Sequence, residues 1–151
     1  MKFFKYFVVC LMPIITFSCT SDEEKVVDQF AVDIKLIDDY IKANSLDAIK
    51  TPQGVYYVVD TIGGAEKPLI TNQVTANYKG YFLDGVVFDS GTNVVFDLFG
   101  VIPGWQIGIP KFGKGGKGKL LIPSKLGYGT SDVDGRTNAV LIFDIELIDF
   151  K

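Results

Sequence analysis

The feature that most constrains the fold is a change of hydrophobic period near Thr51. From there to the C terminus, apolar residues recur at every second position, which is typical of β-strands with one buried face. The segment QVTANYKGYFL, for example, alternates Val74, Ala76 and Tyr78 with polar residues. This part of the chain is therefore predicted to form a sheet. In its last segment, NAVLIFDIELIDF, the predicted inner face consists of Leu141, Phe143, Ile145 and Leu147.

The predicted strands are separated by turn signals and by one short helix. Leu-Asp-Gly at 83–85 is a tight-turn signal between two strands, which indicates antiparallel neighbours. The helix begins at Pro103, a residue suited to the first helical position, and Pro110 ends it early. The predicted fold class is therefore α+β, an antiparallel sheet with one small helix against its face. The predicted strands cover residues 54–62, 73–83, 86–91, 116–123 and 138–150.

Residues 28–49 are predicted to form an N-terminal helix and its connector. Asp28 is a suitable N-cap, and the segment Ala-Asn-Ser at 43–45 can end the helix. We predict that the apolar stripe of this helix packs on the domain that follows; the alternative is that it pairs two copies of the chain. The stripe recurs at three- and four-residue spacing and consists of Phe30, Ile34, Ile37 and Ile41.

The N terminus has the pattern of a secretory signal peptide. Residues 1–18 carry two lysines, then an apolar run that is short for a membrane span, then small residues. Cys19 follows directly, which resembles the lipid-attachment site of bacterial lipoproteins. Cys10 would leave with the signal peptide, and the lone thiol that remains is unusual in an oxidising compartment. We therefore predict lipid attachment at Cys19; the alternative is an ordinary signal peptide followed by an incidental cysteine.

The segment after Cys19 is predicted to be a tether, because it is acidic and too poor in apolar residues to fold alone. The expected location is the envelope of a Gram-negative bacterium, with anchoring in the outer membrane. The acidic stretch resembles signals that send some lipoproteins to the outer surface; the alternative is a solvated linker in the periplasm. The predicted organisation is a signal peptide at 1–18, a lipidated tether at 19–27, the helix and connector at 28–49 and one domain at 50–151.

The composition excludes several classes of function. The chain contains no histidine, so it cannot build a Ser-His-Asp or Cys-His site, and most zinc sites are excluded as well. Its net charge of −3 argues against nucleic-acid binding, which requires a basic surface. No metal ion and no cofactor are expected.

Five short motifs follow one another in the second part of the chain. They are YKG at 78–80, DGVVFDSG at 84–91, VIPGW at 101–105, IPSKLGYG at 122–129 and LIFDIELIDF at 141–150. Their order and spacing resemble the FK506-binding-protein (FKBP) family of peptidyl-prolyl cis-trans isomerases, over about residues 50–151. The resemblance implies the FKBP fold, a sheet wrapped on one short helix. It also implies that the protein accelerates rotation about X-Pro bonds in exported proteins.

The resemblance further implies a pocket for a proline ring, with Trp105 as its floor. The catalytic residues would be Asp89, Trp105 and Tyr128, and the N–H of Ile102 and the hydroxyl of Tyr128 would bind substrate carbonyls. Each aromatic residue alone is also typical of an ordinary core, and one pocket phenylalanine corresponds either to Val94 or to Phe96. The implied ligands are proline-containing polypeptides and FK506-like macrolides. The implied substrate-binding residues are Tyr78, Phe88, Phe96, Val101, Ile102, Trp105 and Phe143.

This chemistry suits a chain without histidine. Rotation about a peptide bond has a barrier of about 18–20 kcal/mol because it breaks amide resonance. Lowering that barrier requires no nucleophile and no metal. It requires a dry aromatic pocket that desolvates the bond and favours the twisted amide over either planar form.

One segment departs from the family pattern. Where family members usually carry an apolar segment before the last strand, this chain has DGRTNA at 134–139. The loop at 134–137 is therefore expected to weaken substrate binding. The main prediction is an active isomerase; the alternative is a chaperone or binding module of the envelope with little turnover. A third alternative is an accessory of an envelope machine that docks through the N-terminal helix.

Overall fold

The computed structural model describes residues 27–151, so the predicted signal peptide, Cys19 and nearly all of the tether lie outside the described residues. Within the described part, no helix is long and apolar enough to cross a membrane.

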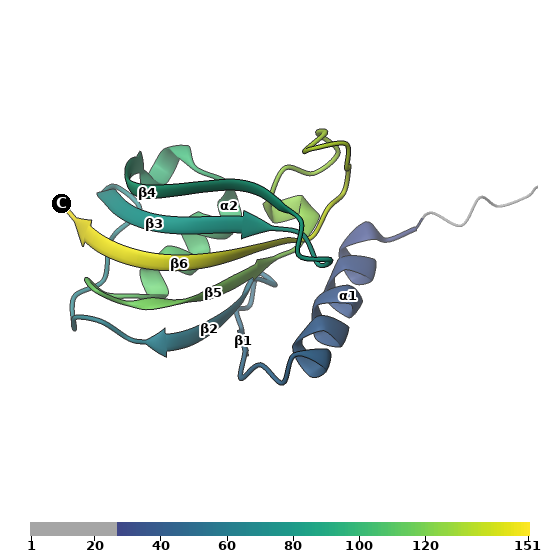
Figure 1. Cartoon of the computed structure of the whole chain (residues 1–151), viewed down its shortest axis with the longest axis horizontal. Coiled ribbons are helices and arrows are strands. Elements are labelled where there is room, and N and C mark those ends of the chain that lie inside the picture. The colour runs from purple at the N-terminus through teal and green to yellow at the C-terminus, as the bar shows by residue number, and fades with distance from the viewer. Residues whose placement is uncertain (1–26) are drawn as a thin grey trace, which may run out of the picture.

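The elements follow in the order α1 (Gln29–Ala43), β1 (Ile49–Lys50), β2 (Tyr56–Thr61), β3 (Gln73–Tyr81), β4 (Val87–Asp97), η1 (Leu98–Gly100), α2 (Pro103–Gly108), η2 (Ile109–Lys111), β5 (Lys117–Ile122), η3 (Ser124–Leu126) and β6 (Leu141–Phe150) (Figure 1).

All six strands form one antiparallel sheet in the order β1-β2-β5-β6-β3-β4, which confirms the predicted α+β class. Strand β4 continues to Asp97, although the sequence pattern indicated a strand only over 86–91. The reason is its place at the edge of the sheet, where none of its residues is fully buried and no hydrophobic period marks its second half. Three short 3-10 helices, η1, η2 and η3, accompany the single α-helix predicted for this part.

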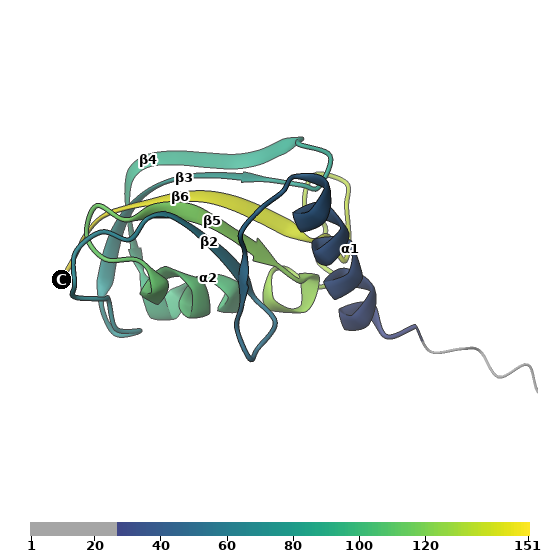
Figure 2. The ribbon, with the colours of Figure 1, turned by 90° about the horizontal axis from the view of Figure 1, so that it is seen from below.

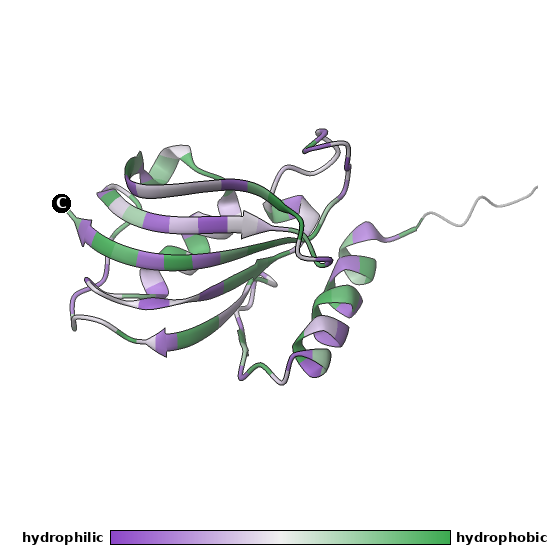
Figure 3. Cartoon of the chain, viewed as in Figure 1, coloured by the Kyte–Doolittle hydropathy of each residue, from purple (hydrophilic) through white to green (hydrophobic). Residues whose placement is uncertain are grey.

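The sheet curves over α2, which lies in the hollow on its concave side (Figure 2). The predicted inner face of β6 is confirmed, because Leu141, Phe143, Ile145 and Leu147 are at most 3 % exposed and belong to the main core. Trp105 of α2 belongs to the same core. Colouring by hydropathy shows the alternation of hydrophobic and hydrophilic residues along the strands (Figure 3).

Helix α2 approaches the sheet closely because it carries glycine where it faces β5. A Cβ atom at Gly104 would collide with the side chain of Ile122, and one at Gly108 would lie 2.6 Å from Leu120 Cδ1. Protein interiors are close-packed, so any larger residue would push the helix away from the sheet. The position of α2, and with it that of Trp105, therefore depends on these glycines.

Helix α1 covers the other face of the sheet at one end. Ile37 is fully buried among Tyr56, Leu121 and Ile142, and this cluster is separate from the core around α2. The predicted N-cap is confirmed, since Asp28 accepts hydrogen bonds from two backbone N–H groups of the first turn. The apolar stripe thus packs on its own domain, as predicted from its spacing.

Replacing Gly104 by alanine should destabilise the protein by about 1–3 kcal/mol, the usual cost of overpacking a filled core. The loss is expected even though alanine is the better helix former. The measurement is urea unfolding followed by the fluorescence of Trp105. Gly64→Ala is the matched control, because a Cβ there would meet no atom closer than 3.7 Å. Equal midpoints for the two variants would contradict the close contact between α2 and β5.

Candidate functional site

A pocket of about 200 Å³ opens beside the start of α2. It is smaller than sites for drug-sized ligands, which span about 300–1,000 Å³, so it suits one small ring. The residues come from β3, β4, β6, the η1–α2 segment and the loop after η3, which the fold brings together. The lining residues are Tyr78, Asp89, Phe96, Gly100, Val101, Ile102, Trp105, Tyr128 and Phe143.

Three aromatic rings contact the indole of Trp105 in edge-to-face geometry. Its centroid lies 5.3 Å from that of Tyr78, 5.2 Å from that of Phe96 and 5.3 Å from that of Phe143, with interplanar angles of 74–84°. Such edge-to-face pairs are favourable beyond their buried area, by about 0.5–1.5 kcal/mol each. Trp105 is only 4 % exposed. The four rings therefore make a fixed, dry base for the pocket.

A polar pair lies on the wall of this aromatic base. The hydroxyl of Tyr78 donates a hydrogen bond of 2.9 Å to Oδ2 of Asp89 on the adjacent strand. Burial, together with this bond, raises the pKa of Tyr78 to about 12. The hydroxyl therefore stays protonated at neutral pH and remains a donor, which fixes the orientation of the carboxylate.

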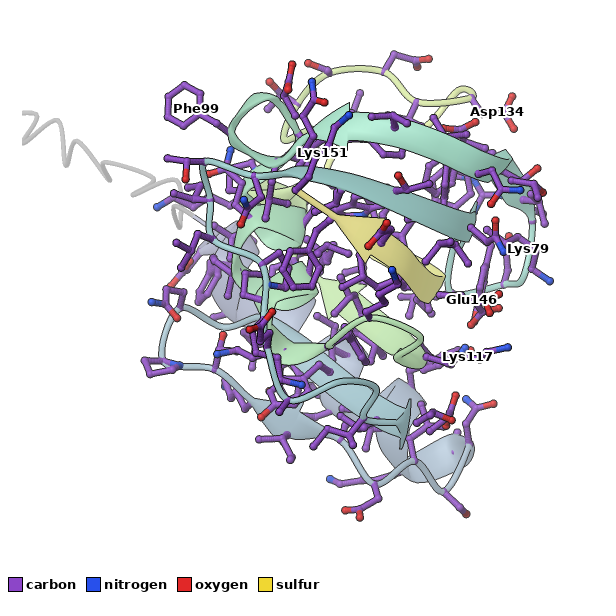
Figure 4. All side chains as sticks on the ribbon, turned by 90° about the vertical axis from the view of Figure 1, so that its left-hand side faces the viewer. Lys79, Phe99, Lys117, Asp134, Glu146 and Lys151 are labelled. Atoms are coloured by element: carbon purple, nitrogen blue, oxygen red, sulfur yellow. The ribbon has the colours of Figure 1, made fainter. Side chains whose placement is uncertain are left out.

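The segment before α2 is fixed by a side-chain amide. Nε2 of Gln106 donates to the carbonyl oxygens of Phe99 and Val101, at 2.9 Å each. The N–H of Ile102 makes no backbone hydrogen bond within the described residues, so this donor at the pocket is free for an acceptor. Phe99 itself does not line the pocket; it is 75 % exposed and projects from the body of the domain (Figure 4).

Tyr128 contributes a further lining residue from outside the sheet. It lies in the turn that follows η3 and is 42 % exposed. Burial, and to a lesser degree the charge of Asp89, raises the pKa of Tyr128. Its hydroxyl therefore remains a hydrogen-bond donor at neutral pH.

The structure brings together nearly all of the predicted site residues. Phe88 is the exception: it packs behind the pocket against Phe82 and Phe143, with centroids at 4.9 Å and 5.5 Å. Of the two candidates for a pocket phenylalanine, Phe96 lines the pocket and Val94 does not. Gly100 lines it as well, but a glycine gives no aromatic or polar signal by which the sequence could identify it. The catalytic and binding roles of all these residues stay predictions.

The loop that departs from the family pattern is held through Arg136. The guanidinium of Arg136 lies 2.9 Å from Oδ2 of Asp84 and stacks over the ring of Phe82, 4.3 Å from its centroid. The hydrogen bond from Arg136 lowers the pKa of Asp84. No residue of 130–139 lines the pocket, so this loop adds no wall to it.

The lining residues suit a pocket that holds and desolvates a ligand. Its lining contains no serine, threonine, cysteine or lysine, and within residues 27–151 no three acidic or cysteine side chains gather closely enough to hold a metal ion. What it offers is an aromatic interior with Asp89, the hydroxyl of Tyr128 and the N–H of Ile102 at its edge.

Comparison with known proteins agrees with this geometry. The family description "FKBP-type peptidyl-prolyl cis-trans isomerase" matches residues 64–148, more than half of the chain. The isomerase FkpA of Escherichia coli K12 is 45 % identical over 103 residues, which cover 65 % of this chain and 38 % of that protein. FkpA of Buchnera aphidicola from Schizaphis graminum is 43 % identical over 108 residues, which cover 68 % and 43 %. The chain thus spans about two fifths of the length of these curated relatives.

Solved structures show the same fold. The crystal structure of FkpA from Escherichia coli superimposes with a TM-score of 0.70 at 38 % identity, covering 81 % of this chain and 61 % of that one. A peptidyl-prolyl cis-trans isomerase from Pseudomonas syringae superimposes with a TM-score of 0.69 at 27 % identity, covering 80 % and 95 %. The chain belongs to the family of FKBP-type peptidyl-prolyl cis-trans isomerases.

Proposed function

We propose that the protein is a peptidyl-prolyl cis-trans isomerase that acts on proline-containing segments of exported proteins. The observation that carries the proposal is the pocket floored by Trp105, which is of a size for one ring and is lined mostly by aromatic and aliphatic residues. Membership of the isomerase family supports the same conclusion.

The mechanism follows from the polarity of the amide. The planar X-Pro bond owes its stiffness to a charge-separated resonance form, which water stabilises. In a dry aromatic pocket that form loses its solvation, so the planar ground state is disfavoured relative to the less polar twisted amide. In this proposal the four rings hold the proline ring, while the N–H of Ile102 and the hydroxyl of Tyr128 hold carbonyl oxygens on the flanking peptide. The carboxylate of Asp89, oriented by Tyr78, completes the polar wall facing the rotating bond.

A binding module with little turnover is the second candidate. It is favoured by one observation: Arg136 ties the 130–139 loop to Asp84, so this loop adds no apolar contact over the pocket. Both candidates use the same pocket, and they differ only in whether the bound amide is allowed to twist. A rate measurement therefore separates them.

The same proposal includes an anchor at the N terminus. Cys19 lies outside the described residues, and the support comes from the signal-peptide pattern that precedes it. Lipid chains on Cys19 would hold the domain at the outer membrane through the acidic tether, facing either the periplasm or the cell exterior. The domain would then meet polypeptides as they arrive in the envelope.

The first test is isomerase activity. The purified protein should accelerate the cis-to-trans conversion of tetrapeptides with an apolar residue before proline, measured by protease-coupled cleavage. Asp89→Ala and Tyr128→Phe should each lower kcat/KM by about tenfold, corresponding to one oriented polar contact of about 1.4 kcal/mol. Asp97→Ala is the control, because this exposed carboxylate on the same strand does not line the pocket. A wild-type rate equal to the uncatalysed one would favour the binding module.

The second test is ligand binding. One ring of an FK506-like macrolide should enter the pocket and quench the fluorescence of Trp105, the only tryptophan in the chain. A proline-containing peptide in excess should reverse the quenching by competition. Unchanged emission at saturating macrolide would contradict an accessible pocket over Trp105.

The third test concerns the anchor. Cys19→Ala should move the protein from the membrane fraction to the soluble fraction, because each buried lipid CH₂ contributes about 0.8 kcal/mol to anchoring. Cys10→Ala is the matched control and should leave the protein in the membrane fraction. Membrane association that survives Cys19→Ala would overturn the lipid anchor. Protease added to intact cells then shows whether the domain faces outward.

A further inference from the structure

Helix α1 is joined to η3 by a carboxylate that is fully buried. Asp33 is 0 % exposed, and its Oδ2 accepts hydrogen bonds from the backbone N–H of Ser124 at 2.8 Å and from the Ser124 hydroxyl at 2.5 Å. Its Oδ1 accepts from Nε2 of Gln29 at 2.7 Å. Asp33 makes no ion pair within residues 27–151. Burying a carboxylate without a neighbouring cation is costly unless its oxygens accept hydrogen bonds. The burial of Asp33 therefore depends on its bonds with Ser124 and Gln29.

Ser124 in turn holds the loop that carries Tyr128. Its carbonyl oxygen accepts hydrogen bonds from the N–H of Gly127 at 2.9 Å and from that of Gly129 at 2.8 Å. These two groups lie on either side of Tyr128 in the chain. The carbonyl of Gly129 then accepts from the N–H of Asn138 at 2.8 Å, which closes the loop. The backbone around Tyr128 is thus fixed to Ser124, and Ser124 is fixed to Asp33.

We propose that Asp33 is a positioning residue that sets the place of Tyr128 in the pocket. The inference rests on the proposed isomerase function. It adds that helix α1 controls the geometry of the pocket, although α1 contributes no residue to the pocket lining. Loss of the Asp33 carboxylate leaves the N–H and hydroxyl of Ser124 without acceptors in a buried place. The η3 turn must then shift to find water, and Tyr128 shifts with it.

A second contact of α1 provides a matched control. Asp38 Oδ1 accepts a hydrogen bond of 2.7 Å from the hydroxyl of Tyr56 on β2, not from a residue of η3. Asp38→Ala also removes a carboxylate that ties α1 to the domain, but it leaves Ser124 untouched. A merely structural role of α1 predicts the same consequences for both variants, whereas the proposal predicts a change at Tyr128 only for Asp33.

The test combines amide hydrogen exchange, measured by NMR, with kinetics of the purified protein. In Asp33→Ala, the amides of Gly127 and Gly129 should exchange about tenfold faster or more, and in Asp38→Ala they should not. Asp33→Ala should lower kcat/KM by about threefold or more, with no further loss when it is combined with Tyr128→Phe.

Asp33→Asn should restore most of both properties, since its amide oxygen can still accept from Ser124. Should Asp33→Ala fail to fold, Ser124→Ala removes only the hydroxyl donor and should change both readouts in the same direction.

Two results would overturn the proposal. One is unchanged exchange at Gly127 and Gly129 in a folded Asp33→Ala protein. The other is an equal loss of kcat/KM from Asp33→Ala in the wild-type and Tyr128→Phe backgrounds, because the effect then does not pass through Tyr128. A wild-type protein without isomerase activity contradicts the proposed function instead, and the exchange rates still decide whether Asp33 holds the loop.

Discussion

Helix α2 has six residues, too few to be stable alone, so it exists only through its contact with the concave face of the sheet. That contact has two parts: glycines that allow the helix to touch Ile122 and Leu120, and an indole that inserts between Tyr78, Phe96 and Phe143. Both parts of the contact involve residues of this one short helix. The floor of the pocket is therefore part of the main core of the domain.

The two sides of the pocket are held in different ways. Tyr78 and Asp89 stand on paired strands, where the ladder of backbone hydrogen bonds fixes their separation. Tyr128 stands on a turn whose backbone is anchored to Ser124 and, through it, to a helix on the opposite face of the sheet. One wall is thus set by the sheet itself and the other by a contact between segments that lie 91 residues apart.

Local patterns predicted the elements that have one buried face. The alternation in β6 identified its inner residues, and the spacing of the α1 stripe identified the side that packs on the domain. The second half of β4 was not predicted, because this edge strand has no buried face that would create a hydrophobic pattern. The family resemblance implied that Phe88 lines the pocket, whereas its ring packs against Phe82 and Phe143, a contact that the motif alone does not reveal. The burial of Asp33 depends on a distant serine, which no local pattern contains.

Strand β6 (Leu141–Phe150) follows the other five strands in the sequence, yet it lies in the interior of the sheet between β5 and β3. Without it the sheet falls into two parts, β1-β2-β5 and β3-β4, each with an open edge. A chain that emerges N terminus first, from a ribosome or through a membrane, can therefore join the two parts of this sheet only after residues 141–150 have emerged. The pocket depends on the same strand, because Phe143 of β6 lies between the parts of the sheet that carry its other walls.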